Sequence, residues 1–375
     1  MNLTSEPVTI GVIGGGQLCR MICEAASPLG FEVVFLDPTS DAPARAVARD
    51  QVVSEFDSVE GANELVESAD YVTYDIELAD PDAVEEVDVP VHPNPDTLRL
   101  IQDKYRQKEA LTKRDIPVPE YVKVGSVEDL RRAADELGLP LMLKAREGGY
   151  DGRGNYLVES PDDFEDALDE LRGELMAEEF VDYDRELSVI GVKGDGETDV
   201  YPVTETVHRD EILRKTVTPA RTTTEVAERA HEVAREVLEA MEGRGVYGIE
   251  LFEHDGSVLV NEIAPRPHNS GHWTIEGAET SQFEQHIRAV TGLPLGSTEL
   301  RDSAVSVNIL GESGDRDVRL EGVDGLLDSG AHLHWYGKRI EYPLRKMGHF
   351  TVTGDDTEEL LRQAEEIKNS LSFEP

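Results

Sequence analysis

Two glutamates twelve residues apart are the most suggestive candidates for catalytic chemistry in this sequence. Glu250 lies in the apolar segment 246–252, and Glu262 lies in the apolar segment 257–263. The turn sequence His-Asp-Gly at residues 254–256 separates the two segments, so we expect a pair of antiparallel strands. Two carboxylates on neighbouring strands can hold one or two Mg²⁺ ions against the phosphates of a nucleotide. The pair therefore predicts a metal-dependent reaction of a nucleoside phosphate.

The register of this hairpin decides whether the two carboxylates share a face of the sheet. They share it when Glu250 lies opposite Glu262, which implies an odd-length loop centred on Gly256. A two-residue turn of Asp255 and Gly256 would place them on opposite faces and weaken the metal hypothesis. Further polar side chains lie close to Glu262, within residues 261–272: Asn261, Arg266, His268, Asn269 and His272. Such a concentration of polar groups is expected of a binding site rather than of a solvated loop.

A glycine-rich stretch, residues 148–154, lies between two predicted strands, 141–144 and 155–158. It lacks the Gly-Lys-Ser/Thr ending of a Walker loop, and no helix follows it. A glycine-dense hairpin loop can bring several backbone amides onto the phosphates of a nucleotide as a mobile lid. Lys144, on the entering strand, would add a charge for the α- or β-phosphate. A merely flexible hairpin is the alternative, but it would not explain the Lys, Arg and Asp in the same dozen residues.

A second glycine cluster, residues 14–16, follows the predicted strand 8–13 and precedes a helix predicted from Gln17. Backbone amides at such a helix start favour binding of a phosphate or carboxylate. Asp37, at the end of the next predicted strand, resembles the acid of a dinucleotide-binding fold. Cys19 stands where that fingerprint has its third glycine, so anion binding of some kind and a purely structural role both stay open.

Four cations stand out in the last 75 residues of an acidic chain: Lys338, Arg339, Arg345 and Lys346. They could form salt bridges on the surface. We favour a clamp for the phosphate of an acceptor substrate, because clustered Arg and Lys side chains bind phosphate by charge-assisted hydrogen bonds.

The elements that must position these residues follow from apolar patterning. Short apolar segments at 8–13, 31–36 and 71–76 alternate with helical segments, which predicts an open parallel sheet up to a linker at Pro93 and Pro95. An apolar stripe at helical spacing between residues 226 and 241 is expected to be core. The last 75 residues predict short strands and a terminal helix from about Asp356. We expect three domains, 1–100, 101–300 and 301–375.

Composition limits the kinds of partner. The formal charge of −42 comes from 78 acids spread along the chain, which disfavours binding to nucleic acid or to an anionic membrane. Such self-repulsion is best tolerated at high salt, so we expect a halophile. Cys19 and Cys23 are expected to be buried thiols in a reducing compartment. We see no signal peptide and no apolar run long enough to span a bilayer, and therefore expect a cytoplasmic protein.

Several strings resemble the ATP-grasp ligases: Lys144 with the glycine hairpin, Glu178-Glu179-Phe180-Val181, and Glu250 with Glu262. Within that superfamily, Gly14 to Leu18 (GGGQL), Gly148 to Asn155 (GGYDGRGN) and Asn261 to Thr274 (NEIAPRPHNSGHWT) resemble the 5-(carboxyamino)imidazole ribonucleotide synthases of purine biosynthesis. The resemblance implies a mixed α/β and α+β chain: an N-terminal open parallel α/β domain, an ATP-grasp domain and a small β-rich C-terminal domain. It also implies that ATP phosphorylates bicarbonate to carboxyphosphate, from which the amine of aminoimidazole ribonucleotide is carboxylated.

The matched motifs imply roles for individual residues. ATP binding is implied for Lys104, Lys144, Gly149, Tyr150, Asp151, Gly152, Arg153, Gly154, Asn155, Glu178, Glu179, Phe180, Val181, Glu186, His208, Asn261 and Glu262. Magnesium, as two ions, would be ligated by Glu250 and Glu262. Catalytic roles are implied for Arg266, His268, Lys346 and Tyr150. The ribonucleotide would be held by Gly16, Gln17, Leu18, Glu77, Lys338, Arg345 and Lys346. Cys19 and the Tyr74-Asp75 pair depart from the family pattern.

Two alternatives stay open, the first a sister ATP-grasp enzyme and the second a protein of a different class. A formate-dependent glycinamide ribonucleotide transformylase would activate formate in place of bicarbonate. A dinucleotide-binding or nucleotide-sensing protein without ligase chemistry would rest on the first glycine cluster and Asp37. A homodimer is expected from the family resemblance alone.

Overall fold

The computed structural model describes residues 7–148, 154–312 and 316–373. A parallel four-stranded sheet begins the chain, in the order β3-β2-β1-β4. Its strands are β1 (Thr9–Ile13), β2 (Glu32–Leu36), β3 (Asp50–Val52) and β4 (Tyr71–Tyr74), and helices α1 (Gln17–Ala26), α2 (Val59–Val66) and α3 (Pro81–Glu85) accompany them. The inner strands are almost continuously apolar and buried, as parallel strands covered on both faces must be. The predicted open parallel sheet is confirmed.

The strand predicted over 71–76 is shorter than expected. β4 ends at Tyr74, so Asp75, Ile76 and Glu77 leave the sheet beyond its carboxyl edge, where ligands of such sheets bind. The predicted linker is also helical: Pro95 opens α4 (Pro95–Gln102), and Asn94 caps it by accepting from the amide of Asp96. Helix α5 (Lys104–Thr112) follows directly, with Asp103 as its N-cap.

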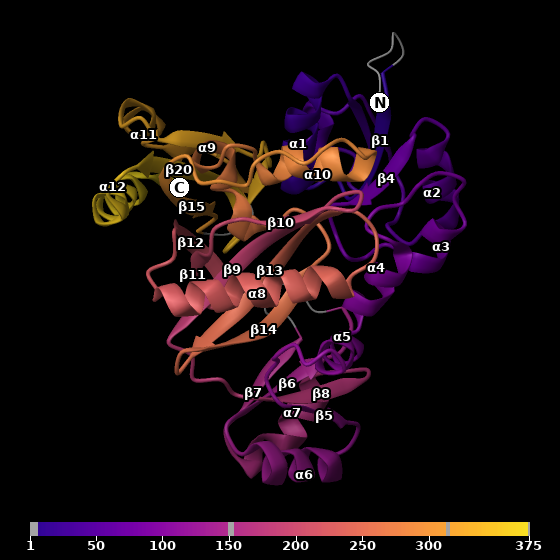
Figure 1. Cartoon of the computed structure of the whole chain (residues 1–375), viewed down its shortest axis with the longest axis vertical. Helices are drawn as coiled ribbons and strands as arrows, with labels where there is room; N and C mark the ends of the chain where they lie inside the picture. The colour runs from indigo at the N-terminus through magenta and orange to yellow at the C-terminus, as the bar shows by residue number, and fades with distance from the viewer. Residues whose placement is uncertain (1–6, 149–153, 313–315, 374–375) are drawn as a thin grey trace.

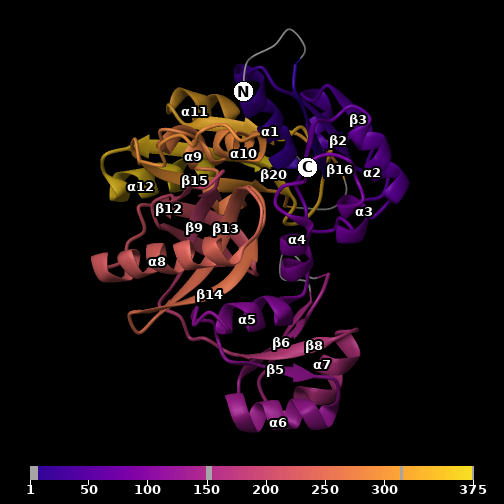
Figure 2. The same ribbon diagram turned by 45° about the vertical axis from the view of Figure 1, so that its right-hand side comes forward.

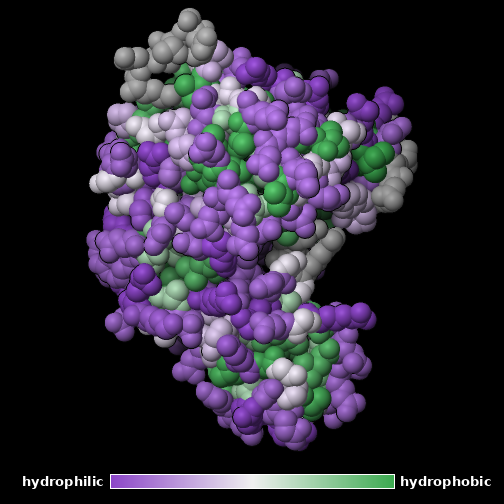
Figure 3. Space-filling model, turned by 90° about the vertical axis from the view of Figure 1, so that its right-hand side faces the viewer, coloured by the Kyte–Doolittle hydropathy of each residue, from purple (hydrophilic) through white to green (hydrophobic). Residues whose placement is uncertain are grey.

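Residues 121–179 form a separate lobe, drawn at the bottom of Figure 1. Its antiparallel sheet has the order β5-β8-β6-β7. The strands are β5 (Tyr121–Val124), β6 (Leu141–Ala145), β7 (Asn155–Val158) and β8 (Leu175–Glu179), and helices α6 (Val127–Leu137) and α7 (Phe164–Glu170) pack on one face. Figure 3 shows a mainly hydrophilic surface that is hollowed between this lobe and the rest of the molecule.

A nine-stranded sheet forms the centre of the molecule, in the order β14-β13-β9-β11-β12-β15-β20-β18 with β10 on β9. Its strands are β9 (Arg185–Lys193), β10 (Thr198–Val200), β11 (Thr204–Arg209), β12 (Ile212–Thr218), β13 (Gly245–His254), β14 (Ser257–Ala264), β15 (Ser303–Leu310), β18 (His332–Trp335) and β20 (Lys346–Gly354). Because β12 pairs with β15, the sheet continues across residue 300. Of the short strands predicted after residue 300, β15 and β20 are longer than expected, while others have only two residues. The domain division stays a prediction.

Helices cover this sheet and join it to the first one. The apolar stripe predicted between residues 226 and 241 lies on α8 (Thr224–Ala240) and is buried against β9, β13 and β14, which confirms it as core. Helix α10 (Gln282–Thr291) packs against both α1 and β13 (Figure 2). The remaining elements are α9 (Thr274–Gly277), α11 (Val323–Asp328), α12 (Thr357–Ser370), and the short pairs β16 (Arg316–Asp317) with β19 (Ile340–Glu341) and β17 (Leu320–Glu321) with β21 (Ser372–Phe373).

The terminal helix predicted from about Asp356 is confirmed as α12, and Asp356 is its N-cap. Cys19 and Cys23 are buried free thiols, also as predicted. Among the described residues, no helix has the length and apolar character needed to cross a membrane.

Candidate active site

A β-bulge brings the two glutamates face to face. His254 pairs with Ser257, so the turn has two residues, Asp255 and Gly256, and not the odd-length loop that a shared face was expected to require. The register shifts after Leu251, which pairs with Val260, and Glu250 then lies opposite Glu262. Asn261 is the extra residue on β14. The expectation that a two-residue turn separates the carboxylates is therefore wrong, because the bulge restores the shared face.

The two carboxylates differ in charge state. Burial raises the pKa of Glu250 to about 7, and the charge of Glu262 adds to this rise. Burial would also raise the pKa of Glu262, but the ammonium of Lys104 outweighs it and the pKa is lowered. Lys104 Nζ lies 3.0 Å from Glu262 Oε1. The structure thus holds one carboxylate that already has a cationic partner beside a second whose charge is poorly compensated.

A cavity of about 330 Å³ lies between the lobe and the central sheet. Two lysines form ion pairs with Glu178. Lys144 Nζ lies 2.8 Å from Glu178 Oε1, and Nζ of the buried Lys108 lies 2.8 Å from Oε2. These lysines outweigh the effect of burial and lower the pKa of Glu178 to about 2. Many residues with predicted ATP roles line this cavity: Lys104, Lys144, Asn155, Glu178, Glu179, Phe180, Val181, Glu186, His208, Asn261 and Glu262.

The far end of this cavity is aromatic. The ring of Tyr183 stacks on Phe252 at 4.9 Å, and both side chains line the cavity wall with the half-exposed Phe180. Glu186 hydrogen-bonds to His208 Nδ1, and burial, which would lower the pKa of the imidazole, is outweighed by this bond together with the charges of Glu250 and Glu186, so that the pKa is raised. Flat apolar walls beside backbone and carboxylate groups suit a purine base and its ribose.

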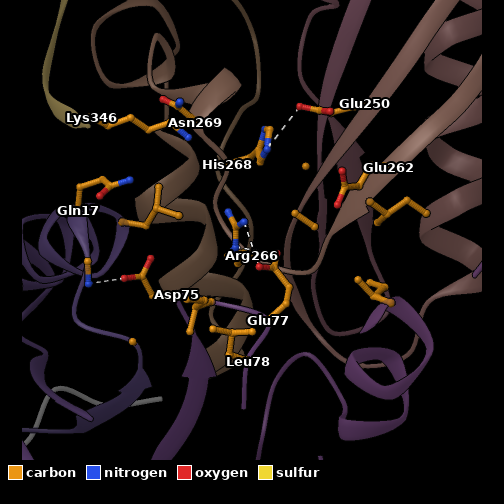
Figure 4. A pocket seen from close by; sticks show the side chains of 18 of the residues that line it. Gln17, Asp75, Glu77, Leu78, Glu250, Glu262, Arg266, His268, Asn269 and Lys346 are labelled. Carbon is orange, nitrogen blue, oxygen red and sulfur yellow. Dashed lines mark hydrogen bonds and ion pairs between the residues drawn. The ribbon is translucent and has the colours of Figure 1, made fainter. Parts of the chain in front are cut away.

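A second cavity, of about 380 Å³, opens towards the first sheet. It includes the predicted residues Gly16, Gln17, Leu18, Glu77, Arg266, His268 and Lys346 (Figure 4). Five residues line both cavities: Lys104, His208, Glu211, Glu250 and Glu262. The two cavities therefore meet at the carboxylate pair.

Arg266 and His268 reach this junction from the loop after β14. Arg266 Nε lies 2.8 Å from Glu77 Oε1, and its second guanidinium nitrogen donates to Glu77 Oε2 at 3.2 Å. Figure 4 shows the His268 ring directed at Glu250, with Nε2 3.6 Å from Glu250 Oε1. A cation, an imidazole and a carboxylate pair thus converge where a reacting anion would lie.

In the first glycine cluster, backbone amides donate hydrogen bonds to carboxylates of the chain itself. Gly15 donates to Asp37 Oδ2 at 2.9 Å, and Gly16 donates to Asp75 Oδ2 at 2.6 Å. Burial raises the pKa of Asp75 to about 6. The dinucleotide alternative loses support, because these amides are not directed at open space. The cluster instead shapes one wall of the second cavity.

The predicted phosphate clamp is assembled only in part. Lys338 Nζ donates to Gln17 Oε1 at 3.0 Å and to the carbonyl of Lys346 at 2.7 Å, beside the second cavity. Arg345 is directed elsewhere: its guanidinium donates to the carbonyl of Ile340 and lies 4.9 Å from the Tyr342 ring. Neither Lys338 nor Arg345 is among the residues lining the cavity.

The glycine-rich stretch is described only at its ends. Gly149, Tyr150, Asp151, Gly152 and Arg153 lie outside the described residues. Gly148 lines the second cavity, and Asn155 lines the first. The carbonyl of Gly154 accepts from Ala145 at 2.7 Å, which closes the β6–β7 pair.

Sequence reasoning missed Lys108, Asp75 and Glu211. Lys108 stands four residues after Lys104 on α5, so the helical period could have placed both on one face. Asp75 had been noted only as a departure from a family pattern. Glu211 lines both cavities from the β11–β12 turn, where it and Asp210 have positive φ, and no motif marked it.

Comparison with known proteins agrees with this geometry over almost the whole chain. Residues 8–102 match the ribonucleotide synthetase preATP-grasp domain, 109–283 the ATP-grasp domain, and 304–363 the phosphoribosylaminoimidazole carboxylase C-terminal domain. The Schizosaccharomyces pombe phosphoribosylaminoimidazole carboxylase is 40% identical over 96% of this chain, which spans 67% of that protein's length.

Solved structures show the same fold. The N5-carboxyaminoimidazole ribonucleotide synthetase of Thermotoga maritima is 44% identical, with a TM-score of 0.89 over 98% of this chain and 99% of that one. The Aspergillus clavatus N5-carboxyaminoimidazole synthase, in complex with ADP and 5-aminoimidazole ribonucleotide, is 36% identical, with a TM-score of 0.88 over 97% of this chain and 98% of that one. The chain belongs to the N5-carboxyaminoimidazole ribonucleotide synthase family of ATP-grasp ligases.

Proposed function

We propose that the chain carboxylates the amine of 5-aminoimidazole ribonucleotide, using ATP and bicarbonate, and forms 5-(carboxyamino)imidazole ribonucleotide, ADP and phosphate. The observation that carries the proposal is the meeting of two cavities at Glu250 and Glu262. One cavity suits a nucleotide, and the other suits an anionic acceptor. The reacting groups of two substrates would then face each other across one junction, as phosphoryl transfer by positioning requires.

The reaction divides into two balanced steps. A bicarbonate oxygen attacks the γ-phosphorus of ATP, the bond to the β-phosphate oxygen breaks, and carboxyphosphate and ADP result. The carboxyl carbon then passes to the amine of the ribonucleotide, either directly or as carbon dioxide, and phosphate leaves. The amine gives up one proton as its new carbon–nitrogen bond forms. Carboxyphosphate hydrolyses readily, so both steps need a site that excludes water.

The carboxylate pair fits Mg²⁺. Among the described residues, no group of three or more His, Cys, Asp or Glu side chains is arranged to hold a metal ion, so the pair would act together with phosphate oxygens. Mg²⁺ is commonly bound by one or two carboxylates plus substrate phosphates. The poorly compensated charge at Glu250 and the ammonium already beside Glu262 both indicate a place for positive charge. When bound, the ion would neutralise charge on the transferred phosphoryl group.

The remaining roles follow from position. Lys104 and Lys144 would bind phosphate oxygens from two sides of the nucleotide cavity. Arg266, held in place by Glu77, would bind the carboxylate of bicarbonate and then that of carboxyphosphate. Lys338 donates hydrogen bonds to both Gln17 and the backbone of Lys346. Gln17 and Lys346 would hold the ribonucleotide at the far side of the second cavity.

A labelled-bicarbonate assay tests this function. We expect ATP-dependent transfer of label from ¹⁴C-bicarbonate to 5-aminoimidazole ribonucleotide, with one ADP formed for each label transferred. Formate in place of bicarbonate should give no ADP above background. ADP formation that requires formate and glycinamide ribonucleotide would instead support the transformylase alternative and would refute the proposal.

A further inference from the structure

We propose that the backbone amide of Ser270 fixes neutral His268 as the Nε2–H tautomer, and that a hydroxyl relay from Ser188 through Ser270 holds the ring so that this N–H is directed at the reacting anion. The two serines would be positioning residues, and His268 would act as a hydrogen-bond donor and not as a proton acceptor. The identity of the anion rests on the proposed function, but the tautomer does not.

The contacts of His268 Nδ1 determine where the ring proton lies. The backbone amide of Ser270 donates to Nδ1 at 3.3 Å, and Ser270 Oγ lies 2.8 Å from the same nitrogen. An amide N–H can only donate, so Nδ1 must be the acceptor. A neutral imidazole carries one ring proton, and that proton is therefore on Nε2.

The direction of the relay follows from this assignment. Ser270 has one hydroxyl proton, which goes to Nδ1. Ser188 Oγ lies 2.6 Å from Ser270 Oγ, so the hydroxyl of Ser188 must donate to Ser270. Both serines are almost fully buried, at 1% and 0% exposure, and bulk water does not compete for these bonds. Each donor in the series thus has one acceptor.

The surrounding chain prevents the ring from turning over. Gln282 clamps the backbone of His268, accepting from its amide at 2.9 Å and donating to its carbonyl at 2.7 Å. The ring packs on Gly248, where an added Cβ would lie 2.4 Å from the Cβ of His268. Nε2 consequently faces the junction of the two cavities, 3.6 Å from Glu250 Oε1.

An N–H donor at this position has a specific chemical use. Bicarbonate, carboxyphosphate and the transferred phosphoryl group all present anionic oxygens, and a pre-oriented donor stabilises such an oxygen without reorganising during the reaction. An Nδ1–H tautomer would instead turn a lone pair towards these oxygens and repel them. The contacts at Nδ1 therefore select the ring state that matches the charge of the reacting group.

Long-range ¹H–¹⁵N correlation spectra of protein labelled with ¹⁵N-histidine read the tautomer directly. The His268 signal is identified by its loss in His268→Gln. We expect the Nε2–H pattern in the wild type and also in Ser270→Ala and Ser188→Ala, because both variants keep the backbone amide that donates to Nδ1. An Nδ1–H pattern in the wild type would overturn the proposal, whatever the activity of the enzyme. This readout therefore separates a failure of the tautomer assignment from a failure of the proposed function.

Kinetics supply the second readout. In Ser270→Ala we expect kcat/KM for bicarbonate to fall about tenfold, with KM for ATP unchanged, because the loss of one oriented hydrogen bond affects only the reacting anion. Thr204→Val is the matched control: Thr204 pairs with Ser188 in the sheet, but among the described contacts its buried hydroxyl bonds that of Thr218 at 2.8 Å and neither serine of the relay. Equal bicarbonate kinetics in Ser270→Ala and Thr204→Val would contradict the relay. Ser188→Ala provides the same test if Ser270→Ala does not fold.

Discussion

Glu178→Gln should destabilise the protein and weaken its affinity for ATP, because Glu178 is the only acid between the buried Lys108 and the partly buried Lys144 in the described part of this cluster. The pKa of Glu178 falls from 4.5 to about 2 in the folded chain. At ~1.4 kcal/mol per pH unit, this shift sets an upper bound of about 3 kcal/mol on the stability at neutral pH, because burial lowers the pKa of Lys108 and offsets part of it. For 375 residues unfolding together, losing the whole of it would lower Tm by at most about 4 °C.

Differential scanning calorimetry against pH measures this contribution. The folded pKa of Glu178 is depressed, so its contribution is present above about pH 4.5 and is lost as pH falls towards about 2. We expect a constant difference in Tm between wild type and variant from about pH 8 to about pH 5, and a smaller difference below it. Glu179→Gln, which alters the next residue on the same strand, is the control and should shift Tm much less, because Glu179 bonds only the amide of Glu120 among the contacts described.

Two outcomes would refute this reasoning. If Glu178→Gln melts at the same temperature as Glu179→Gln, the two lysines do not depend on the carboxylate. If its Tm deficit persists unchanged to about pH 3, the deficit does not come from ionisation of Glu178. Isothermal titration calorimetry measures the affinity of wild type and Glu178→Gln for ADP. We expect the variant to bind ADP about tenfold more weakly, because Lys144 loses the partner that orients it.

Three further predictions follow from the site. Glu262→Gln should leave the fold intact and lower kcat by at least about 100-fold, because it removes a charged metal ligand; near-normal turnover would contradict the metal assignment. Asp75→Asn should raise Tm above about pH 7, because burial raises the pKa of Asp75 to about 6 and the ionised form therefore costs stability that protonation restores. The gain should vanish below about pH 4, where the carboxyl is neutral in both states, and a gain independent of pH would count against this explanation. Lys338→Met should raise KM for the ribonucleotide about tenfold without changing KM for ATP, since Lys338 joins Gln17 to the backbone of Lys346; a change in KM for ATP alone would show that it serves the other cavity.

The sequence predicted local features well where local physics decides them. The strand-turn-helix at residues 9–26 follows from an apolar run, glycine and a helical period, and the terminal helix begins beside Asp356, where it was expected. The residues that the family motifs assigned to the site make up just under half of those that line the two cavities. The homodimer and the saline environment stay predictions.

Features that depend on distant parts of the chain were not predictable in the same way. The bulge at Asn261 depends on how β13 pairs along its whole length. Turn length alone therefore wrongly predicted that a two-residue turn would place Glu250 and Glu262 on opposite faces. The pairing of β12 with β15 joins segments far apart in the sequence, and no pattern within either strand specifies it. The ion pair between Lys108 and Glu178 joins two elements that are distant in the sequence, and it was not predicted.

The most direct test of the central claim is the position of the metal in a crystal of the protein with ADP and Mn²⁺, located by anomalous scattering. The account predicts a manganese peak that touches the carboxylates of both Glu250 and Glu262 as well as a phosphate oxygen. A peak held by other side chains, with these two carboxylates directed away from it, would contradict it.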